Sequence, residues 1–275
     1  MNVVANDYAE SILLVVERQN SSYLRKRRGR KNAAGVSLSL YLRIYRASAG
    51  ITTLSQLRNS VRSQFDIMSK VVGVLALQGS FAEHIDCLEA CVRENGHNVE
   101  VIAVKTQQEL ARCDSLIIPG GESTAISQIA ERTGLHEHLY QFVRTPGKSA
   151  WGTCAGLIFL SNQVANQAAL LKPLGILDVT VERNAFGRQL QSFEKDCDFS
   201  SFWDHDGPFP TVFIRAPVIS KINSKNVEVL YTLQRDDGSE QIVAVRQGSI
   251  LGTSFHPELG SDTRFHDWFL RTFVL

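Results

Sequence analysis

The sequence predicts an α/β protein with a doubly wound, mostly parallel sheet flanked by helices, and with additional strands in its C-terminal half. Short, continuous apolar runs recur from Val71 onward, and such runs are typical of strands that are buried on both faces of a parallel sheet. Amphipathic segments separate these runs, which indicates βαβ units. After Pro173 the pattern changes to short strands bounded by turn residues, so the second half adds strands of its own.

The first half of this region alternates strands with helices. Strands are predicted over Val71–Leu77, Val99–Val104, Ser115–Ile118 and a segment ending at Trp151. Helices are predicted over Phe81–Glu94, Gln107–Cys113, Glu122–Arg132 and His136–Val143, with another along the apolar run that follows Cys154 and reaches Lys172. The turns at Gln78-Gly79, Gly120-Gly121-Glu122 and Cys154 each follow a strand. We expect them to meet at one sheet edge, where such folds place their sites.

The second half is predicted to consist mainly of strands. These are expected over Ile176–Glu182, Gln189–Phe193, Thr211–Arg215, Val227–Leu233, Gln241–Arg246 and Ile250–Phe255. Turn residues such as Asp236-Asp237-Gly238 separate them. Asp196–Pro210 is predicted to be a loop, and a helix from Asp262 to about Phe273 closes the chain.

Residues 1–67 differ in composition from the rest of the chain. They carry 11 Lys and Arg against 4 Asp and Glu, a net charge of +7, whereas the remaining residues carry 18 against 24. The overall charge of +1 argues against a nucleic-acid binder. The basic run Arg25–Lys31 fits either a nuclear or nucleic-acid-binding signal or a solvated charge run, and the second is favoured because like charges repel. We expect a basic extension over 1–67, disordered or outside the folded unit, and a folded domain over 68–275.

The cysteine content and the apolar runs indicate a cytoplasmic protein. Five cysteines without paired metal-binding spacing fit a reducing compartment. No apolar run reaches the ~18 residues of a membrane span, and the acidic residues Asp7, Glu10 and Glu17 are unlike a secretory leader. Cys87 and Cys91, four residues apart on a predicted helix, are interpreted as core residues, and Cys113 and Cys197 receive no role. His84 is predicted to lie at the surface, where it faces either a partner or solvent.

The segment Gly152-Thr153-Cys154-Ala155-Gly156 joins a buried strand to a helix through a sharp turn. The same layout with serine is the nucleophile elbow of α/β-hydrolases. The two glycines allow a tight turn and a close approach of strand and helix. Cys154 at a helix N-terminus is stabilised as a thiolate, and the Ala155 N–H can face an oxyanion. Taken alone, a single cysteine is more often a small buried hydrophobic residue.

The segment Phe255-His256-Pro257-Glu258 supplies a base and a carboxylate. Two residues apart in an extended segment, His256 and Glu258 project to the same side. Glu258 can hold the imidazole through Nδ1 and leave Nε2 to take the thiol proton of Cys154. An isolated histidine is more often structural, but this pair in one α/β chain with the cysteine elbow favours a Cys-His-Glu catalytic site.

From Val71 to Leu275 the chain resembles the class I glutamine amidotransferases and, within that class, the glutaminase subunits of pyridoxal 5′-phosphate synthase. The elbow and the His-Pro-Glu segment are shared across the class. The segments that resemble the subfamily are Ile117–Thr124 (Ile-Ile-Pro-Gly-Gly-Glu-Ser-Thr), Val181–Gln189 (Val-Glu-Arg-Asn-Ala-Phe-Gly-Arg-Gln) and Phe213–Pro217 (Phe-Ile-Arg-Ala-Pro). Val74–Gly79, Gly152–Ile158 and Phe255–Leu259 match as well.

The resemblance implies a site for the hydrolysis of L-glutamine to glutamate and ammonia. It implies Cys154 as the nucleophile, His256 as its base and Glu258 as the residue that orients the base. It also implies glutamine contacts from Gly121, Glu122, Ser123, Arg183, Ile214 and Arg215. The residue types agree, since arginine suits the substrate carboxylate and Glu122 suits the ammonium group. Gly121 and Ala155 are the expected oxyanion donors.

The resemblance also implies a partner, because free ammonia would be protonated in water. That partner is a (β/α)₈-barrel synthase subunit that makes pyridoxal 5′-phosphate in vitamin B6 biosynthesis, in a hetero-oligomer. No metal and no organic cofactor are expected, and neither nucleic acid nor membrane is an expected partner. The alternatives are a glutaminase for another synthase, a γ-glutamyl hydrolase, or a regulatory subunit without catalytic activity.

Overall fold

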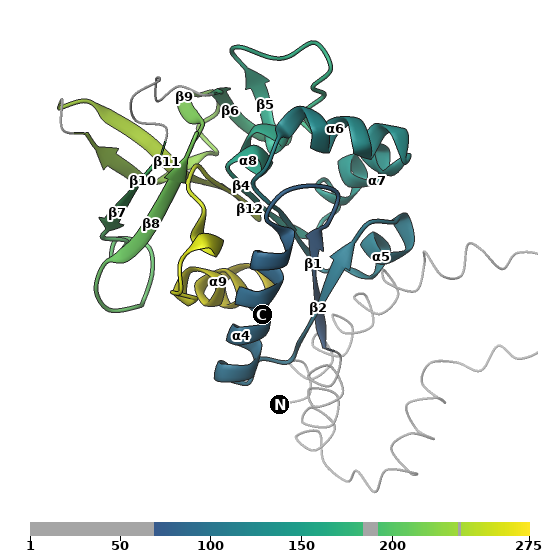
Figure 1. Cartoon of the computed structure of the whole chain (residues 1–275), viewed down its shortest axis with the longest axis horizontal. Helices are drawn as coiled ribbons and strands as arrows, with labels where there is room; N and C mark the ends of the chain where they lie inside the picture. The colour runs from purple at the N-terminus through teal and green to yellow at the C-terminus, as the bar shows by residue number, and fades with distance from the viewer. Residues whose placement is uncertain (1–68, 184–191, 236–237) are drawn as a thin grey trace, which may run out of the picture. The chain divides into compact units, whose positions relative to one another are not determined.

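The computed structural model describes residues 69–183, 192–235 and 238–275, and everything below concerns these residues (Figure 1). The predicted basic extension over 1–67 and the start of the folded unit at Met68 lie outside them. The same holds for most of the Val181–Gln189 segment, although Arg183 is included.

The first half forms the predicted alternation of strands and helices. Its elements are β1 (Lys70–Leu75), α4 (Phe81–Asn95), β2 (Val99–Val104), α5 (Gln107–Arg112), β3 (Ser115–Ile118), α6 (Ser123–Arg132), α7 (Leu135–Phe142), β4 (Ser149–Thr153) and α8 (Ala155–Leu160). Local chemistry explains several ends. Gly96 stops α4 in the left-handed conformation with φ 67°, and Thr106 with Glu109 forms a reciprocal capping box on α5.

The main sheet contains ten strands and is parallel through its centre. Its order is β2-β1-β3-β4-β12-β11-β9-β6-β5, and β10 pairs with β11. The strands of the second half in this order are β12 (Ile250–Thr253), β11 (Glu240–Gln247), β9 (Val218–Ile222), β6 (Leu177–Glu182), β5 (Ser161–Val164) and β10 (Glu228–Gln234). The pairs that connect β2, β1, β3, β4 and β12 are all parallel, whereas β11 pairs with its neighbours in antiparallel fashion. The predicted α/β fold with a mostly parallel sheet and extra C-terminal strands is therefore confirmed.

Helices cover both faces of the central strands. One core cluster contains side chains of α5, α6, α7 and α8, and the other contains side chains of α4 and the C-terminal helix α9 (Arg264–Phe269). In Figure 1, α4 and α9 lie side by side on one face of the sheet. Strands buried from both sides need continuous apolar runs, which explains the pattern seen in the sequence.

The second half departs from the prediction in several elements. Its strands are β5 (Ser161–Val164), β6 (Leu177–Glu182), β7 (Ser192–Cys197), β8 (Phe209–Ile214), β9 (Val218–Ile222), β10 (Glu228–Gln234), β11 (Glu240–Gln247) and β12 (Ile250–Thr253). The helix after Cys154 was predicted to continue toward Lys172, but it ends at Leu160 because Ser161 begins β5, which pairs with β6. Strand β9 was not predicted. β7 and β8 pair and shorten the predicted loop to residues 198–208.

The closing helix is also divided. A 3-10 turn, η2 (Pro257–Leu259), precedes α9, and a π-helical segment, η3 (Leu270–Val274), follows it. Helical structure is therefore present where one helix was predicted from Asp262 to Phe273, but it consists of an α-helix followed by a π-helical segment. None of the helices described has both the length and the hydropathy needed to cross a bilayer.

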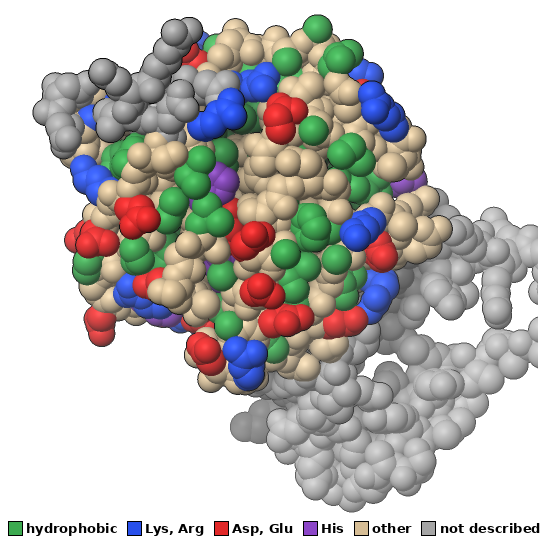
Figure 2. All heavy atoms as spheres, viewed as in Figure 1, with side chains coloured by type: hydrophobic (Ala, Val, Ile, Leu, Met, Phe, Trp, Pro, Cys, Tyr) green, Lys and Arg blue, Asp and Glu red, His purple; other side chains and the backbone are tan. Residues whose placement is uncertain are grey.

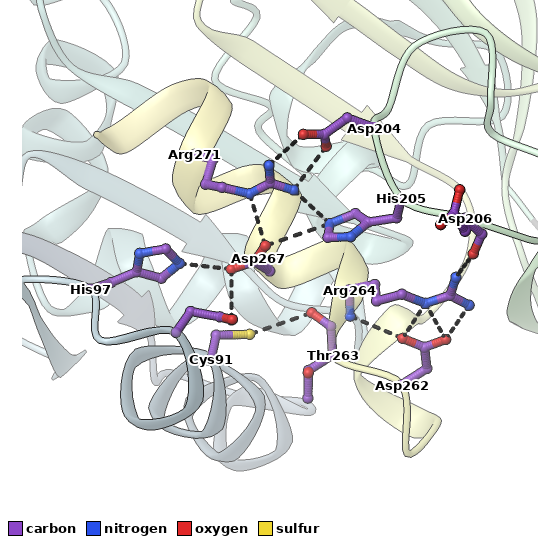
Figure 3. A network of polar contacts seen from close by, with 11 residues as sticks. Cys91, His97, Asp204, His205, Asp206, Asp262, Thr263, Arg264, Asp267 and Arg271 are labelled. Carbon is purple, nitrogen blue, oxygen red and sulfur yellow. Dashed lines mark hydrogen bonds and ion pairs between the residues drawn. The ribbon is translucent and has the colours of Figure 1, made fainter.

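A polar network around Asp267 ties α9 to neighbouring segments (Figure 3). One Asp267 oxygen accepts hydrogen bonds from His97 Nε2 at 2.7 Å and Asn95 Nδ2 at 2.9 Å, and the other accepts from Arg271 Nε at 2.8 Å. The Arg271 guanidinium continues to both oxygens of Asp204 in the loop over residues 198–208. The network fixes the C-terminal helix against α4 and this loop.

The surface carries charges of both signs. Figure 2 shows acidic and basic side chains on the face in view, with hydrophobic side chains between them. Within the described ranges, no group of three or more His, Cys, Asp or Glu residues has an arrangement that could hold a metal ion.

Candidate active site

Cys154 lies in a strained turn between β4 and α8. Its backbone has φ 47° and ψ −100°, a conformation that side-chain-bearing residues rarely adopt. The two flanking glycines make the turn possible. A Cβ on Gly152 would lie 2.5 Å from the Gly156 carbonyl carbon, and a Cβ on Gly156 would collide with the Ile118 carbonyl. The elbow predicted from the sequence is therefore present.

Strand pairing brings the cysteine and histidine segments together. β4 and β12 are parallel, with Thr153 opposite Thr253, so both strands end at the same edge of the sheet. The Cys154 N–H donates to the Thr253 carbonyl at 2.8 Å, and the His256 N–H donates to the Val212 carbonyl, also at 2.8 Å. The two segments are about a hundred residues apart in the chain, yet strand pairing and backbone hydrogen bonds hold both of them at this edge.

His256 and Glu258 form a buried pair. His256 Nδ1 lies 2.7 Å from Glu258 Oε1, and the side chains are 9% and 0% exposed. Burial lowers the pKa of His256, but hydrogen bonds with Cys154 and Glu258 and their charges outweigh it and raise the pKa to about 10. The arrangement favours an imidazolium that is held by the Glu258 carboxylate next to Cys154.

Glu258 is kept ionised although it is buried. Desolvation raises the pKa of this carboxyl, but the electrostatic attraction of the His84 ring, the hydrogen bonds from His256 and Ser80 and the charge of His256 overcome it and bring the pKa to about 2. Ser80 Oγ donates to Oε1 at 2.5 Å, and His84 Nε2 lies 3.3 Å from Oε2. A carboxylate in this state can orient the imidazole without taking its proton.

His84 was predicted to lie at the surface, and this was wrong. The side chain is fully buried, between Glu258, Thr153 and His266. The apolar stripe of α4 did not reveal it, because polar residues are normally assigned to the solvent face of a helix. Ser80 was also missed. Ser80 is the N-cap residue of the helix that follows β1 and His84 lies near the start of that helix, close to the sheet edge where the site was expected, and this position was the available signal.

The three strand-end turns do meet, as predicted. The Ser80 N–H donates to the Gly120 carbonyl at 3.1 Å, and the Glu122 N–H donates to Gln78 Oε1 at 2.7 Å. A Cβ on Gly120 would collide with the His256 ring, so this glycine allows the imidazole to lie against the end of β3. Gly121 has φ 155°, and Ala155 begins α8 beside Cys154.

Glu122, Ser123 and Arg183 gather at the N-terminus of α6. Glu122 caps this helix by accepting from the N–H groups of Thr124 at 2.9 Å and Ala125 at 2.7 Å. Partial burial raises the pKa of Glu122, but these bonds and the Arg183 charge outweigh it, so its pKa is lowered. Arg183 Nη2 lies 3.3 Å from Glu122 Oε1, and Ser123 is buried at the start of the helix.

Ile214 and Arg215 approach the cysteine from the end of β8. The Ile214 carbonyl lies 3.9 Å from Cys154 Sγ, and the Ile214 side chain is partly exposed. Arg215 has φ 45°, so Arg215 and Cys154 are the two non-glycine residues with positive φ in the described parts of the chain. Strained backbone of this kind is concentrated at functional sites.

The other four cysteines are buried as well, and none of them lies on a strained turn beside His256 as Cys154 does. Burial raises the pKa of Cys87 and Cys113 to about 11 and that of Cys91 to about 12, so these thiols are kept protonated. The assignment of Cys87 and Cys91 to the core is confirmed, since both lie on the buried face of α4.

Comparisons with known proteins agree with this geometry. Residues 74–275 match the SNO glutamine amidotransferase family. The probable pyridoxal 5′-phosphate synthase subunit SNO3 of Saccharomyces cerevisiae is 56% identical over 217 residues, covering 76% of this chain and 98% of that protein. The pyridoxal 5′-phosphate synthase subunit PdxT of a Nocardioides species is 44% identical over 199 residues, covering 72% and 94%.

A solved structure is similar as well. A crystal structure of a glutamine amidotransferase superposes with a TM-score of 0.61 at 40% identity, covering 73% of this chain and 97% of that one. The family match spans well over half of the chain and includes both the cysteine elbow and the His-Pro-Glu segment. The chain therefore belongs to the SNO glutamine amidotransferase family.

Proposed function

We propose that this chain hydrolyses L-glutamine to glutamate and ammonia as the glutaminase subunit of a pyridoxal 5′-phosphate synthase. One observation carries the proposal: Cys154 stands on a strained elbow beside a buried His256 whose Nδ1 is 2.7 Å from Glu258. A nucleophile, a base and a residue that orients the base are the requirements of acyl transfer through a covalent intermediate.

In the proposed reaction, the Cys154 thiolate attacks the γ-carboxamide carbon of glutamine. His256 then protonates the departing ammonia and afterwards activates the water that hydrolyses the γ-glutamyl thioester. Glu258 holds the His256 tautomer that leaves Nε2 free for these transfers. His256 gives one proton to the departing ammonia and takes one from the attacking water, so the enzyme is regenerated.

The tetrahedral oxyanion needs hydrogen-bond donors near Cys154. Ala155 begins α8, so its N–H has no intrahelical acceptor, and we assign it as one donor. We assign the Gly121 N–H as the second, since the turn that carries it contacts both Gly79 and Gln78. Each such donor contributes typically about 3–4 kcal/mol to the transition state.

The substrate's amino-acid end requires charges of both signs. We assign Arg183 and Arg215 to its carboxylate and Glu122 to its ammonium group, with Gly121, Ser123 and Ile214 as further contacts. Arg183 Nη2 lies 3.3 Å from Glu122 Oε1, so this ion pair presents a positive and a negative group side by side to the two charges of a zwitterion.

The synthase partner is part of the proposal. The relatives are named as subunits of pyridoxal 5′-phosphate synthase, and ammonia released to water would be protonated before it could react. We therefore propose a hetero-oligomer with a (β/α)₈-barrel synthase subunit, in the cytoplasm. Residues 68–275 are proposed as the glutaminase domain. The proposed steps use no metal ion and no organic cofactor.

The test is glutaminase activity of the purified chain, alone and with the synthase subunit. We expect Cys154→Ala to lower ammonia release by about 10⁴-fold or more, because no other group replaces the nucleophile. Cys113→Ala is the matched control, a buried cysteine whose neighbouring charges include no residue of the site, and it should keep its activity. Full ammonia release by Cys154→Ala would exclude the mechanism.

The same measurement separates the alternatives. A regulatory subunit without catalysis would bind the synthase but release no ammonia in the unsubstituted form. A γ-glutamyl hydrolase would prefer γ-glutamyl peptides to free glutamine. A glutaminase for another synthase would release ammonia without supporting pyridoxal 5′-phosphate formation.

A further inference from the structure

Two buried histidines, His84 and His266, lie next to Glu258 and have no part in the steps above. His84 Nε2 is 3.3 Å from Glu258 Oε2 and 3.2 Å from Thr153 Oγ1, and His84 Nδ1 is 2.9 Å from His266 Nε2. Both histidines are 0% exposed. Buried imidazoles are costly to desolvate, so their contacts call for a physical explanation.

The hydrogen-bond partners determine where the protons lie. The Thr153 hydroxyl can accept and an ionised carboxylate attracts an N–H, so the favourable form of His84 carries its proton on Nε2, where it bonds to Thr153 Oγ1 and lies near Glu258 Oε2. His266 Nδ1 has no hydrogen-bond partner among the described residues, and a buried N–H without an acceptor is rarer than a bare acceptor. The His266 proton therefore lies on Nε2 and is donated to His84 Nδ1. Burial lowers the pKa of both rings, which agrees with two neutral histidines.

This assignment gives the chain of hydrogen bonds one direction. His266 donates to His84, and His84 donates to Thr153 Oγ1 while its Nε2 lies 3.3 Å from Glu258 Oε2. Ser80 and His256 donate to Glu258 Oε1. Oε1 is therefore held by two hydrogen-bond donors, whereas Oε2 accepts no hydrogen bond from the described residues and is held by its 3.3 Å electrostatic contact with His84. Since Oε1 is the oxygen that meets His256 Nδ1, rotation of the carboxylate would disturb the base directly.

We propose that His84 is a positioning residue of the glutaminase reaction: its Nε2–H, 3.3 Å from Glu258 Oε2, attracts that oxygen, turns Oε1 toward His256 Nδ1 and so presents His256 Nε2 to Cys154. The proposal rests on the proposed function. The ionisable groups that act on His84 are Glu258 and His256 at the sheet edge, His266 on α9 and Glu83 on its own helix. Glu258 Oε2 accepts no hydrogen bond from the described residues, so without the electrostatic attraction of His84 the buried oxygen would favour the protonated carboxyl.

The test compares His84→Leu with His84→Gln in the complex with the synthase subunit. Leucine fills the space without a donor, whereas the glutamine amide can place an N–H near Glu258 Oε2. We expect His84→Leu to lower kcat by roughly 10–100-fold with KM for glutamine nearly unchanged, an effect typical of residues that orient a functional histidine. The acidic limb of the kcat–pH profile should move to higher pH. His84→Gln should recover most of both effects.

Cys91→Ala is the control for packing. It truncates another fully buried side chain of α4 and leaves the Glu258 contacts intact, so it can lower the unfolding temperature but should not move the pH profile. If His84→Leu does not fold, His84→Asn replaces it, since its shorter amide does not reach Oε2. Equal kcat and pH profiles in wild type and His84→Leu would overturn the proposal, as would an identical loss in the leucine, asparagine and glutamine variants.

A second readout separates this inference from the proposed function. The rate at which iodoacetamide alkylates Cys154 at neutral pH reports the thiolate and requires no glutamine. Mass spectrometry of the Cys154 peptide measures this rate. We expect slower alkylation in His84→Leu and alkylation near the wild-type rate in His84→Gln. Absence of ammonia release by the wild-type complex would refute the proposed function, whereas an unchanged alkylation rate in His84→Leu would refute the role of His84.

Discussion

At the scale of single residues, the site depends on charges that stabilise one another in a buried place. His256 and Glu258 are nearly inaccessible to water, and each would be costly as an isolated ion. The Cys154 thiol, the Ser80 hydroxyl and the His84 ring complete the partners that make the ionised forms favourable. Removal of one partner is therefore expected to change the protonation of the others.

Glu258→Gln tests this coupling through the pH dependence of stability. The pKa of His256 is raised from 6.5 to about 10, so its contribution is complete below pH 6.5 and is lost as the pH rises through about 10. The pKa of Glu258 is lowered from 4.5 to about 2, so its contribution is present above pH 4.5 and is lost as the pH falls through about 2.

In Glu258→Gln the free energy of unfolding should therefore vary less with pH between about 6.5 and 10 than in wild type, as measured by urea denaturation across that range. Ammonia release should fall by roughly 10²–10⁴-fold, because the imidazole loses its orienting carboxylate. A variant with wild-type pH dependence would show that the pair is not coupled in solution.

At the scale of elements, close backbone contacts at the strand ends allow the side chains to converge. α8 passes so near β3 that position 156 has room for hydrogen alone on the side facing Ile118. Gly120 gives the His256 ring a similar approach to the end of β3. Because these glycines have no Cβ, the neighbouring segments can approach closely enough for three strand ends to meet at one edge of the sheet.

Gly156→Ala should destabilise the protein. Its Cβ would collide with the Ile118 carbonyl, and overpacking of backbone against backbone typically costs about 1–3 kcal/mol. Gly260→Ala is the matched control, since the nearest atom to its Cβ would be 3.8 Å away. Chemical denaturation of the two variants measures the difference. Equal stability of both would mean that strand and helix can separate at no cost.

At the scale of the whole molecule, two cores on opposite faces of the sheet support one edge. α4 and α9 bring Ser80, His84 and His266 beneath Glu258, and the Asp267 network fixes α9 in that place. The family match covers residues 74–275 and therefore includes α4 and α9, but it does not extend over residues 1–67. The glutaminase domain over 68–275 thus stays a proposal.

A chain that comprises only residues 68–275 tests that proposal. We expect it to fold and to release ammonia with the synthase subunit at a rate within about twofold of the full chain, because the site residues all lie beyond Met68. Circular dichroism and a coupled ammonia assay provide the two measurements. Insoluble or inactive protein, with the full chain active under the same conditions, would mean that residues 1–67 belong to the folded unit.

Much of the fold and of the candidate site could be predicted because it follows from local pattern. Continuous apolar runs predicted the central strands, and the glycines around Cys154 predicted the elbow, since few other residues permit that turn. The helix after the elbow was predicted too long and β9 was missed. Whether a short segment pairs as a strand depends on the neighbour that it meets, and here the neighbours are distant in sequence.

The sequence by itself determined the chemistry available to this protein: a thiol on a sharp turn, a His-Pro-Glu segment at a strand end, and arginines and a glutamate for a zwitterion. Only the tertiary structure decided which further polar residues contact the catalytic groups. Ser80 and His84 begin an ordinary amphipathic helix, and their contacts with Glu258 span more than 170 residues of chain. Such contacts arise from the packing of α4 against the C-terminal segment, which no local periodicity encodes.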